Sequence, residues 1–579
     1  MEGGTAVWAQ TTGFPPTFIF PFTDAGNFGM ANLYEFQVLM YRPLYWYGTN
    51  GQPTVDYNLS LAEAPKWSAD GLTATVIIKP YKWSNGETAD ASNVMFWMHM
   101  LEMEKTNYGG YAPGYLPDNL TSYRTLAKNK ISFTFDKVYS HNWVLMNQLS
   151  LITPMPKAWD RTAAGPSDCT NNRADCPAVY DYLIEQNNDQ AHFATSPVWS
   201  VVNGPWKLKS YNPGGQVTFV PNEKYSGPNK PHLAEFKEVP FASDENEYNR
   251  LRAGAASPDA IQVGHLPFGH TTAPTADPTK GGPNPLSENY TLIPQIVFSI
   301  RYFALNFNNP TAAGSIFKQL YFRQALQSTV DQDAAIRDVY KGYGYRTNGP
   351  VPALPDSNLI SPAQRNDPYP FSIDRAKQLL TAAGWDVSTA PGRCVNPGTG
   401  LGQCGAGIAQ GDKLSFSMRY ASGHPTLTLT MDKLKADAAQ TGIEINLSQA
   451  DGDTLARENT TCTPSPSTPC AWQMIDWNGG WIYGPNFYPT GESLYQTSAG
   501  VNFGSYSDPQ ADALITKTVT SDALSDLYAY QDYVAKQVPV IWMANFPVRL
   551  LEVANNLKGV TPINPFGMIN PEDWYYVRK

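Results

Sequence analysis

The most informative stretch of the sequence runs through residues 476–489 and reads Asp476-Trp477-Asn478-Gly479-Gly480-Trp481-Ile482-Tyr483-Gly484-Pro485-Asn486-Phe487-Tyr488-Pro489. Glycine lets a backbone pass close to a ligand, and Trp and Tyr offer broad apolar faces with one polar group each. So much Gly and Pro disfavours a helix interior. The stretch therefore predicts a loop held rigidly against a ligand. A surface loop with its aromatic side chains folded underneath is the alternative.

Length and composition restrict the class of protein. A chain of 579 residues exceeds the size at which one core keeps growing, so we expect two or three domains. Charged residues make up only 16% and aromatic residues reach 13%, which suits an extracytoplasmic protein with an aromatic-rich cleft. The net charge is −10 and no block of Lys and Arg occurs, which argues against nucleic acid as a partner. No apolar run approaches about 18 residues, so no membrane span is expected.

The six cysteines fall in three close pairs, each within a loop-like segment rich in Pro, Gly, Ser, Thr or Asn. Local pairing is the simplest of the possible connectivities, and disulfides indicate an oxidising compartment. Zinc would need shorter spacings and nearby histidines. Such short loops gain roughly 2–3 kcal/mol at most from a disulfide, so the bonds restrain loops and do not hold the fold together. The predicted pairs are Cys169 with Cys176, Cys394 with Cys404, and Cys462 with Cys470.

No motif in the sequence indicates an enzyme or a cofactor. The nucleophile elbow, the HExxH zinc motif and the P-loop are all missing. The glycine-rich segment 398–402 lies between two cysteines and does not join a strand to a helix, which disfavours dinucleotide binding. The histidines are scattered, so no metal site is predicted. We therefore expect a protein that is not an enzyme and has no cofactor.

The start of the chain, Met1-Glu2-Gly3-Gly4-Thr5, looks like a mature N-terminus with an added initiator Met. We expect that an export signal, and with it a lipidated cysteine, has been removed from the precursor.

The second half of the chain shows an α/β pattern. Helices are expected at 315–329, 331–341, 372–383, 426–440, 509–518 and 521–537. Strands are expected at 302–308, 414–420 and 443–447, with the first of parallel-sheet character and 538–543 as the last buried strand. In the first half, we expect a helix at 30–41, a strand at 73–78 and a helix capped by Ser92.

The order and spacing of several segments resemble the extracytoplasmic solute-binding proteins of peptide-type ABC importers, the oligopeptide, dipeptide and nickel-binding class known as solute-binding protein family 5. The resemblance covers almost the whole chain. The segments that carry it are Leu61–Trp67 with Asp70-Gly71, Trp83–Glu87 with Ala91–Val94, Asn203–Leu208, Pro221–Tyr225, Phe322–Leu326 with Asp331, and Ala376–Leu380 with Ala383–Trp385.

This resemblance implies an α/β, two-lobed fold of the periplasmic-binding-protein type, with a hinge and an extra third domain fused to the first lobe. Carried onto this chain, the first lobe comprises 1–44, 195–297 and 550–579. The extra domain is 45–194 and the second lobe is 298–549, with 476–490 as its ligand-facing loop. The chain would cross between the lobes near 298 and 550.

The ligand-facing loop departs from the family pattern in its charges. The family has an Asp three residues after the Trp, which pairs with the α-amino group of a bound peptide. Here Gly484 stands at that place after Trp481. Arg42 stands where the family often has Glu. Both changes remove negative charge from the expected amine end, and Asp476 is a candidate replacement.

The resemblance implies a receptor that captures a solute, with an oligopeptide as the first hypothesis, and delivers it to the membrane permease of an ABC importer. An oligosaccharide receptor and a signalling or recognition protein without a transport role are the alternatives. We expect a monomer at the cell surface or in the periplasm. The predicted ligand-binding residues are Phe18, Arg42, Asp476, Trp477, Gly480, Trp481, Ile482, Tyr483, Gly484 and Trp542.

Overall fold

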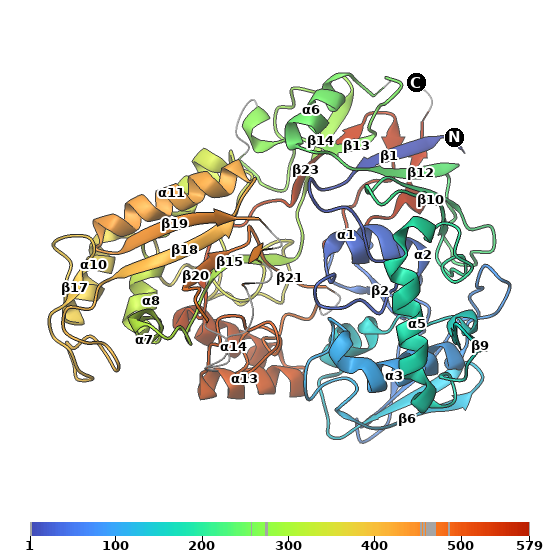
Figure 1. The fold of residues 1–579 in the computed structure, drawn as a ribbon, viewed down its shortest axis with the longest axis horizontal. Helices are drawn as coiled ribbons and strands as arrows, with labels where there is room; N and C mark the ends of the chain where they lie inside the picture. The colour runs from blue at the N-terminus through green and yellow to red at the C-terminus, as the bar shows by residue number, and fades with distance from the viewer. Residues whose placement is uncertain are drawn as a thin grey trace.

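Three β-sheets organise the fold, as the ribbon of the computed structural model shows (Figure 1). The structure describes residues 3–255, 257–271, 276–451, 454, 455, 458, 470–484 and 487–577. The names used below follow the sheets. The first lobe surrounds a seven-stranded sheet, the second lobe surrounds a six-stranded sheet, and the extra domain surrounds a four-stranded sheet.

The seven-stranded sheet of the first lobe collects strands from three distant parts of the chain. Its order is β10-β11-β12-β1-β13-β23-β14, and β1 runs parallel to both β12 and β13. Helix α6 (Asp244–Arg252) begins at Ser243, whose side chain accepts the N–H of Asn246, and contacts β13. The strands are β1 Thr5–Ala9, β10 Trp206–Tyr211, β11 Val217–Pro221, β12 Glu235–Val239, β13 Val263–His265, β14 Tyr290–Gln295 and β23 Arg549–Ala554.

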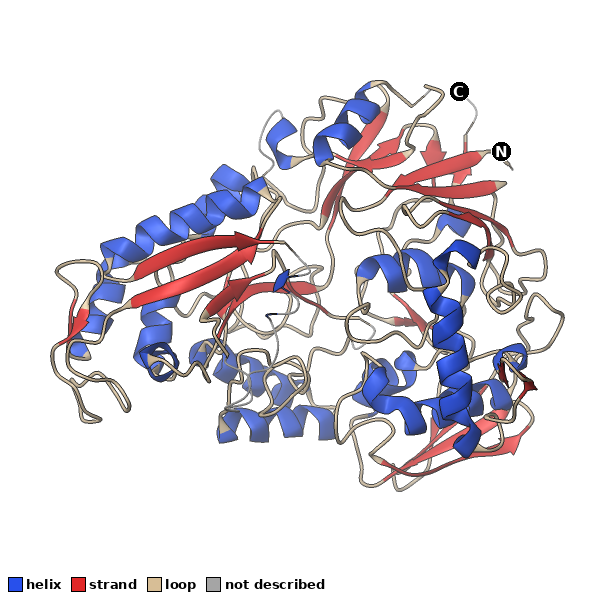
Figure 2. Ribbon diagram, viewed as in Figure 1, coloured by secondary structure: helices blue, strands red, loops and turns tan. Residues whose placement is uncertain are grey.

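The six-stranded sheet of the second lobe lies among helices (Figure 2). Its order is β19-β18-β20-β15-β21, and β22 also pairs with β15. Helix α11 packs on β19 and α8 packs on β22. The strands are β15 Ser299–Leu305, β18 Ser415–Ala421, β19 Glu444–Ala450, β20 Met474–Asp476, β21 Gly480–Ile482 and β22 Ile541–Trp542; the main helices are α7 Ala312–Phe317, α8 Leu320–Gln327, α10 Ile373–Ala382, α11 Pro425–Gln440, α13 Pro509–Thr520 and α14 Leu524–Gln537.

Several expectations for the second lobe were wrong. Strand β15 is fully buried, as its apolar run predicts, but its pairings with β20, β21 and β22 are all antiparallel. An apolar run reports burial on both faces and not strand direction. The helix expected at 315–329 is divided into α7 and α8, and the one expected at 331–341 is a short α-helix (α9, Gln332–Ala334) continued by a π-helical turn (η9, Ala335–Val339).

The extra domain combines the sheet β4-β5-β7-β6 with the long helices α3 (Ala91–Glu104) and α5 (Cys176–Asn188). The N-cap of α3 is Asp90 and not Ser92. The Asp90 carboxylate accepts the N–H of Ser92 at 2.9 Å, and Asn93 returns a bond to the N–H of Asp90, so the two form a capping box. The strands are β4 Lys66–Trp67, β5 Thr73–Ile77, β6 Leu120–Ala127 and β7 Lys130–Phe135.

Short elements connect these bodies. The helix expected at 30–41 is present, with a π-helical turn (η1, Leu33–Gln37) between α1 and α2. The remaining short helices and strands are α1 Met30–Asn32, α2 Val38–Met40, α4 His141–Trp143, η3 Val144–Gln148, β2 Trp46–Tyr47, β3 Val55–Asp56, β8 Arg161–Thr162, β9 Gly165–Pro166, β16 Trp385–Asp386, β17 Arg393–Cys394, β24 Leu557–Lys558 and β25 Tyr575–Tyr576.

The chain passes between the two larger sheets twice, through 296–298 and through 543–548. The second crossing is hydrogen-bonded to the end of β14, where the first crossing begins, because the N–H of Val548 donates to the carbonyl of Gln295 at 2.9 Å. The prediction that 538–543 holds the last buried strand was wrong, because β22 covers only two residues and β23 follows the second crossing.

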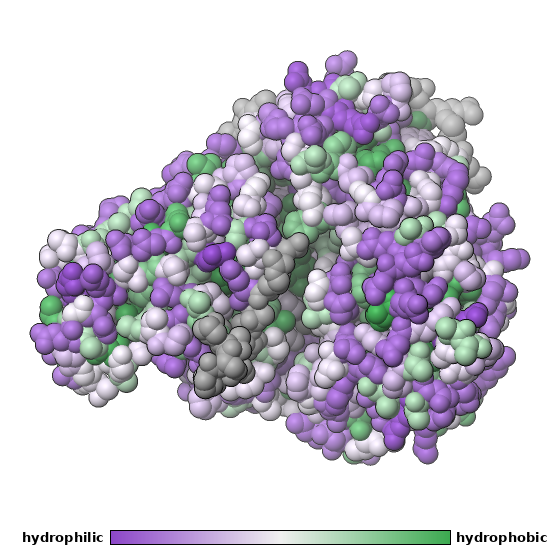
Figure 3. Space-filling view, viewed as in Figure 1, coloured by the Kyte–Doolittle hydropathy of each residue, from purple (hydrophilic) through white to green (hydrophobic). Residues whose placement is uncertain are grey.

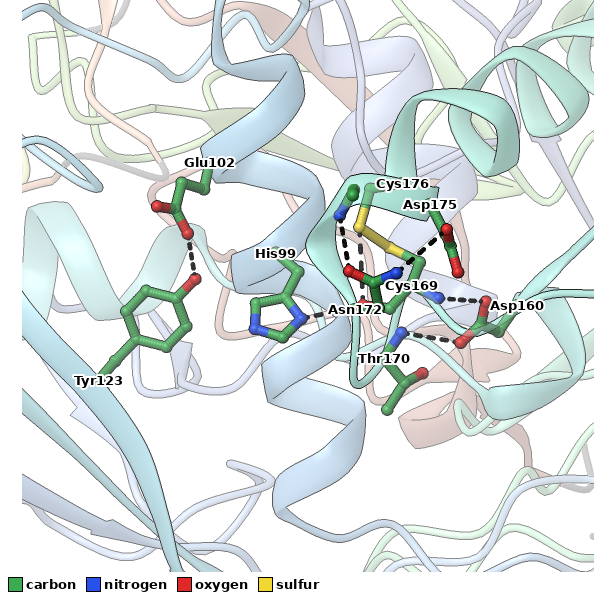
Figure 4. The surroundings of a disulfide bond; sticks show 10 residues. His99, Glu102, Tyr123, Asp160, Cys169, Thr170, Asn172, Asp175 and Cys176 are labelled. Atoms are coloured by element: carbon green, nitrogen blue, oxygen red, sulfur yellow. Dashed lines mark hydrogen bonds between the residues drawn. A yellow bond between two sulfur atoms is a disulfide. The ribbon is translucent and has the colours of Figure 1, made fainter.

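Two of the predicted cysteine pairs form disulfide bonds, Cys169–Cys176 and Cys394–Cys404. The third includes Cys462, which lies outside the described residues. Figure 4 shows how the first bond is held. The N–H of Cys169 donates to the Asp160 carboxylate at 2.9 Å, and the carbonyl of Cys169 lies 2.9 Å from Nδ1 of His99.

Candidate ligand-binding site between the lobes

Strands β20 and β21 are two halves of one extended segment that runs antiparallel to β15. A bulge at 477–479 separates the halves, and Asn478 adopts φ 65° there. Strand β18 lies beside β20 as far as the pair Tyr420 and Asp476. Among the described strands, none pairs with the second edge of β21. The predicted ligand-facing loop therefore contains a short strand with one free edge.

The backbone polar groups of Gly480 and Ile482 point toward that free edge. Tyr483 donates its N–H to Phe298 at 2.9 Å, and Tyr302 donates to Gly479 at 3.5 Å, so the odd-numbered residues of this segment face β15. In an antiparallel pair, the intervening residues direct their N–H and C=O groups away from the partner strand. Two residues of β21 therefore offer main-chain donors and acceptors to a further strand.

Two glycines allow this segment to pack closely. A Cβ at Gly480 would lie 2.0 Å from the carbonyl oxygen of Ile300, so no side chain fits there. A Cβ at Gly484 would lie 2.8 Å from the Tyr34 hydroxyl and 3.4 Å from Phe566. Gly484 belongs to the second lobe, whereas Tyr34 and Phe566 lie outside it in the chain. The loop thus meets the opposite side of the molecule at the position where the family pattern has Asp.

Aromatic rings fill the contact between the lobes. Phe487 stacks on Tyr47 with ring centroids 4.3 Å apart and lies 5.0 Å from Phe566. Phe298, in the first crossing, contacts both Phe566 and Tyr483. In the space-filling view, the surface is hollowed between the second lobe on the left and the rest of the molecule on the right (Figure 3). The loop therefore lies at an aromatic interface between the second lobe and the rest of the molecule.

Asp476 is fully buried and lies beside Arg301, with Oδ2 3.7 Å from Nη2. Its Oδ1 accepts the N–H of Asn478 at 2.7 Å. Burial raises the pKa of Asp476, while Arg301 and the backbone N–H groups act in the opposite direction. The guanidinium of Arg301 also lies over the ring of Phe546. In this conformation, the negative charge of Asp476 is balanced within the protein.

The aromatic residues of the loop differ in exposure. Trp477, Trp481 and Ile482 are half-buried. Tyr483 is only 1% exposed, and its hydroxyl donates to the carbonyl of Pro350 at 2.5 Å. Trp542 is equally buried in β22, between the rings of Tyr302 and Tyr495. The half-buried side chains are thus the ones that can reach a ligand without a large rearrangement.

The structure does not bring the other two predicted residues to this loop. Arg42 is 1% exposed, pairs with Glu572 and lies over the ring of Trp46, 3.9 Å from its centroid. Phe18 is 5% exposed, and its backbone is bonded to the side chains of Asn32 and Gln37. Both residues are held within the part of the molecule that faces the second lobe.

The sequence analysis missed a contact between the extra domain and the second lobe. Asn147 in η3 donates to the carbonyl of Tyr488 at 2.9 Å and accepts its N–H at 2.8 Å. Trp143 in α4 donates to Glu492 at 2.8 Å. Ser140 donates to Asp522 at 2.6 Å. These partners are more than 340 residues apart in the chain, so no local pattern could have indicated them.

Two hollows lie away from the loop. One, of about 250 Å³, is in the first lobe and is lined in part by Trp8, Leu551 and Trp574. The other, of about 710 Å³, is an open groove on the extra domain beside the Cys169–Cys176 bond. Its charged residues Glu102 and Lys105 are already paired with Arg173 and Asp118. The geometry therefore favours the lobe interface as the site.

Within the described ranges, no group of three His, Cys, Asp or Glu residues could hold a metal ion. The helices in the described part of the chain include none that is long and apolar enough to cross a membrane.

The crossings and the interface loop define a two-lobed solute-binding protein, and the comparisons with known proteins agree. The family model of bacterial extracellular solute-binding proteins, family 5, matches residues 56–497. The chain therefore belongs to this family, and the predicted α/β, two-lobed fold class is confirmed.

Curated relatives are distant in sequence. Protein XP55 of Streptomyces lividans is 24% identical over 421 residues, which cover 70% of this chain but only 64% of that protein. The glutathione-binding protein GsiB of Pectobacterium atrosepticum is 21% identical over 84% of this chain and 79% of its own length.

Solved structures match over the full length. The oligopeptide-binding protein AppA of Bacillus subtilis, solved with a nonapeptide, has a TM-score of 0.70 and 19% identity, with 100% of this chain and 99% of that chain covered. NikZ of Campylobacter jejuni, solved with Ni(L-His), has a TM-score of 0.65 and 17% identity, with 98% and 99% covered. At these identities, the likeness shows the fold alone.

Proposed function

We propose that this protein captures an extended peptide between its two lobes and presents it to the permease of an ABC importer. One observation carries the proposal, which is the free edge of β21 with the main-chain groups of Gly480 and Ile482 directed outward. An extended peptide can add to such an edge as a further strand. The peptide-binding relatives and the AppA complex support the same class of ligand.

Recognition through the main chain would give affinity for many sequences. The ligand side chains would then meet the half-buried Trp477 and Trp481 and the lobe-interface aromatics. The proposed site comprises Asp476, Trp477, Gly480, Trp481, Ile482, Tyr483 and Gly484. Arg42, Phe18 and Trp542 would act from behind the binding surface, because each is buried among protein neighbours.

The charge pattern distinguishes this receptor from the usual peptide-binding arrangement. Gly484 offers no carboxylate, and Asp476 is balanced by Arg301. A free ligand α-ammonium would gain little from either position. We therefore infer a preference for peptides whose affinity depends on the main chain rather than on a charged N-terminus.

An oligosaccharide is the second candidate ligand. The faces of two half-buried tryptophans, Trp477 and Trp481, suit the stacking of sugar rings, and a sugar needs no ammonium site. A recognition role without transport would use the same surface.

The sheet composition supports the domain division 1–44, 195–297 and 550–579 for the first lobe, 45–194 for the extra domain and 298–549 for the second lobe. The two crossings would form the hinge. We further propose a monomer without enzymatic activity, held outside the cytoplasm by a lipid anchor on the precursor, as the family and the disulfides suggest.

The test combines identification of the ligand with a substitution that removes a main-chain hydrogen-bond donor. Mass spectrometry of ligand retained through purification should reveal peptides, and thermal-shift screening against peptide and oligosaccharide panels should give stabilisation by peptides. Ile482→Pro removes one outward N–H, whereas Ile482→Ala shortens the side chain and keeps that N–H. We expect calorimetric peptide affinity to fall at least tenfold in the proline variant and less than threefold in the alanine variant. Stabilisation by sugars alone would refute the peptide proposal.

A further inference from the structure

The carboxyl group of Glu492 is buried at the boundary between the second lobe and the extra domain. The side chain is 5% exposed. Its Oε1 accepts the indole N–H of Trp143 at 2.8 Å and the amide of Asn147 at 3.2 Å. Both donors belong to the helical segment 141–148 of the extra domain. One carboxyl oxygen of Glu492, a residue of the second lobe, is therefore covered by the extra domain.

The second oxygen, Oε2, has no hydrogen-bond partner among the described residues and is shielded from solvent. Glu492 forms no ion pair with any described residue. The titratable groups that face it are the phenols of Tyr115 in the extra domain, Tyr483 beyond β21 and Tyr530 in α14. None of these phenols supplies a positive charge.

Such surroundings favour the neutral acid over the carboxylate. A desolvated carboxylate without a counter-charge is costly, whereas a protonated carboxyl group is much less so. Burial accordingly raises the pKa of Glu492, while the neighbouring side chains of Thr490, Trp143 and Asn147 act in the opposite direction. The proton belongs on Oε2, because Oε1 already accepts hydrogen bonds from Trp143 and Asn147.

We propose that closure of the second lobe onto the extra domain takes up one proton at Glu492, so that this residue links ligand capture to pH. The proposal rests on the hinge motion of the proposed function. Separation of the lobes removes the cover of Trp143 and Asn147 and returns the carboxyl group to water. A solvated glutamate ionises with a pKa of about 4.3, so the open form is ionised at neutral pH.

The sign of the linkage follows from the two pKa values. The pKa is higher in the closed form, so Glu492 favours closure fully below the open-form value. This preference is lost as the pH rises from the open-form value through the closed-form value. Closure and ligand retention should therefore weaken with increasing pH, by up to tenfold per pH unit within that window.

The experiment measures the distance between the lobes directly. The disulfides leave no free cysteine in the described part of the chain, so spin labels can be placed at Lys128→Cys in the extra domain and Lys435→Cys in α11. Both positions are exposed. Electron–electron double resonance then gives the closed fraction between pH 4.5 and 8, with and without a library of tri- to pentapeptides.

Two variants separate the carboxyl proton from the contact itself. Glu492→Gln imitates the neutral acid and keeps the acceptor for Trp143. Asp522→Asn alters a second contact at the same boundary, where Asp522 accepts from Ser140. Thermal melting with retained circular dichroism serves as the folding check for each variant.

We expect the closed fraction of the wild type to fall as the pH rises, that of Glu492→Gln to stay constant within twofold, and that of Asp522→Asn to keep the wild-type slope at a changed level. A slope retained in Glu492→Gln, or missing from the wild type while peptides still close it, would overturn this inference alone. A distance that responds neither to peptide nor to pH would overturn the proposed hinge closure as well.

Discussion

The hydroxyl of Tyr34 occupies the space that a side chain at position 484 would need, since a Cβ on Gly484 would lie 2.8 Å from it. This pair joins a helical turn that precedes the extra domain to the ligand-facing loop of the second lobe. The missing carboxylate at Gly484 is therefore part of how the two lobes fit together. Relative to the family pattern, position 484 therefore differs both in charge and in the space that its side chain occupies.

Restoring the carboxylate should not restore an ammonium site. Gly484→Asp would clash with Tyr34, so we expect closure to be impaired and peptide affinity to fall at least tenfold in calorimetry. Gly484→Asp combined with Tyr34→Ala relieves the clash and should recover most of that loss. If Gly484→Asp alone binds peptides more tightly, the lobes do not meet here in the bound state.

Trp481 should contribute directly to ligand binding. Trp481→Ala removes a half-buried ring from β21, and we expect a loss of more than about 1 kcal/mol in binding free energy with an unchanged melting temperature. Tyr182→Ala, a half-buried ring on α5 of the extra domain, is the matched control and should leave the affinity unchanged. Equal affinity of the Trp481 variant and the wild type would show that the cleft lies elsewhere.

Glu572 should matter for stability because it is the partner of Arg42. Glu572→Ala leaves a buried guanidinium without its counter-charge, which costs about 3–5 kcal/mol. Removal of Asp338 from its exposed pair with Arg337 should leave the stability nearly unchanged. Chemical denaturation measures both. A cost below about 1 kcal/mol for Glu572→Ala would contradict the buried pair.

Glu552 should make stability depend on pH. Burial in β23 raises the pKa of Glu552 to about 8, against a hydrogen bond from Asn284. The folded-state pKa is the higher one, so this group stabilises the fold fully below about pH 4, and its contribution is lost as the pH rises through 8. Glu552→Gln should lack this loss.

We therefore expect the unfolding free energy of Glu552→Gln, relative to that of the wild type, to increase by roughly 1 kcal/mol per pH unit between pH 5 and 8. Urea denaturation at several pH values measures the difference. Glu185→Gln, at an exposed position on α5, serves as the control and should follow the wild type. Parallel curves for all three proteins would rule out the effect.

The sequence predicts the local elements well where periodicity and capping agree. The apolar stripe of residues 372–383 and the glycine that follows it predict α10, observed at Ile373–Ala382. Asp331 is the N-cap of α9, at the start of the helix expected at 331–341. The resemblance also indicates the two crossings. Strand direction could not be predicted in the same way, because the apolar run of β15 is compatible with parallel or antiparallel partners.

The site is only partly predictable for a related reason. The loop at 476–489 can be predicted from the sequence, because its glycines and aromatic residues indicate a closely packed loop without knowledge of distant partners. The buried pairing of Arg42 could not be predicted from the sequence, because its partner Glu572 lies 530 positions away. Asn147 and Glu492 likewise acquire their roles only when the extra domain meets the second lobe.

The bare edge of β21 also has a bearing on solubility. An unpaired strand edge can recruit the edge of another molecule and so start aggregation. In the intact chain, Tyr34 and Phe566 lie against Gly484, two residues after the end of β21, so another part of the molecule lies beside this strand. A fragment containing the second lobe alone would lack these neighbours. The first lobe and the extra domain therefore also limit self-association through this strand.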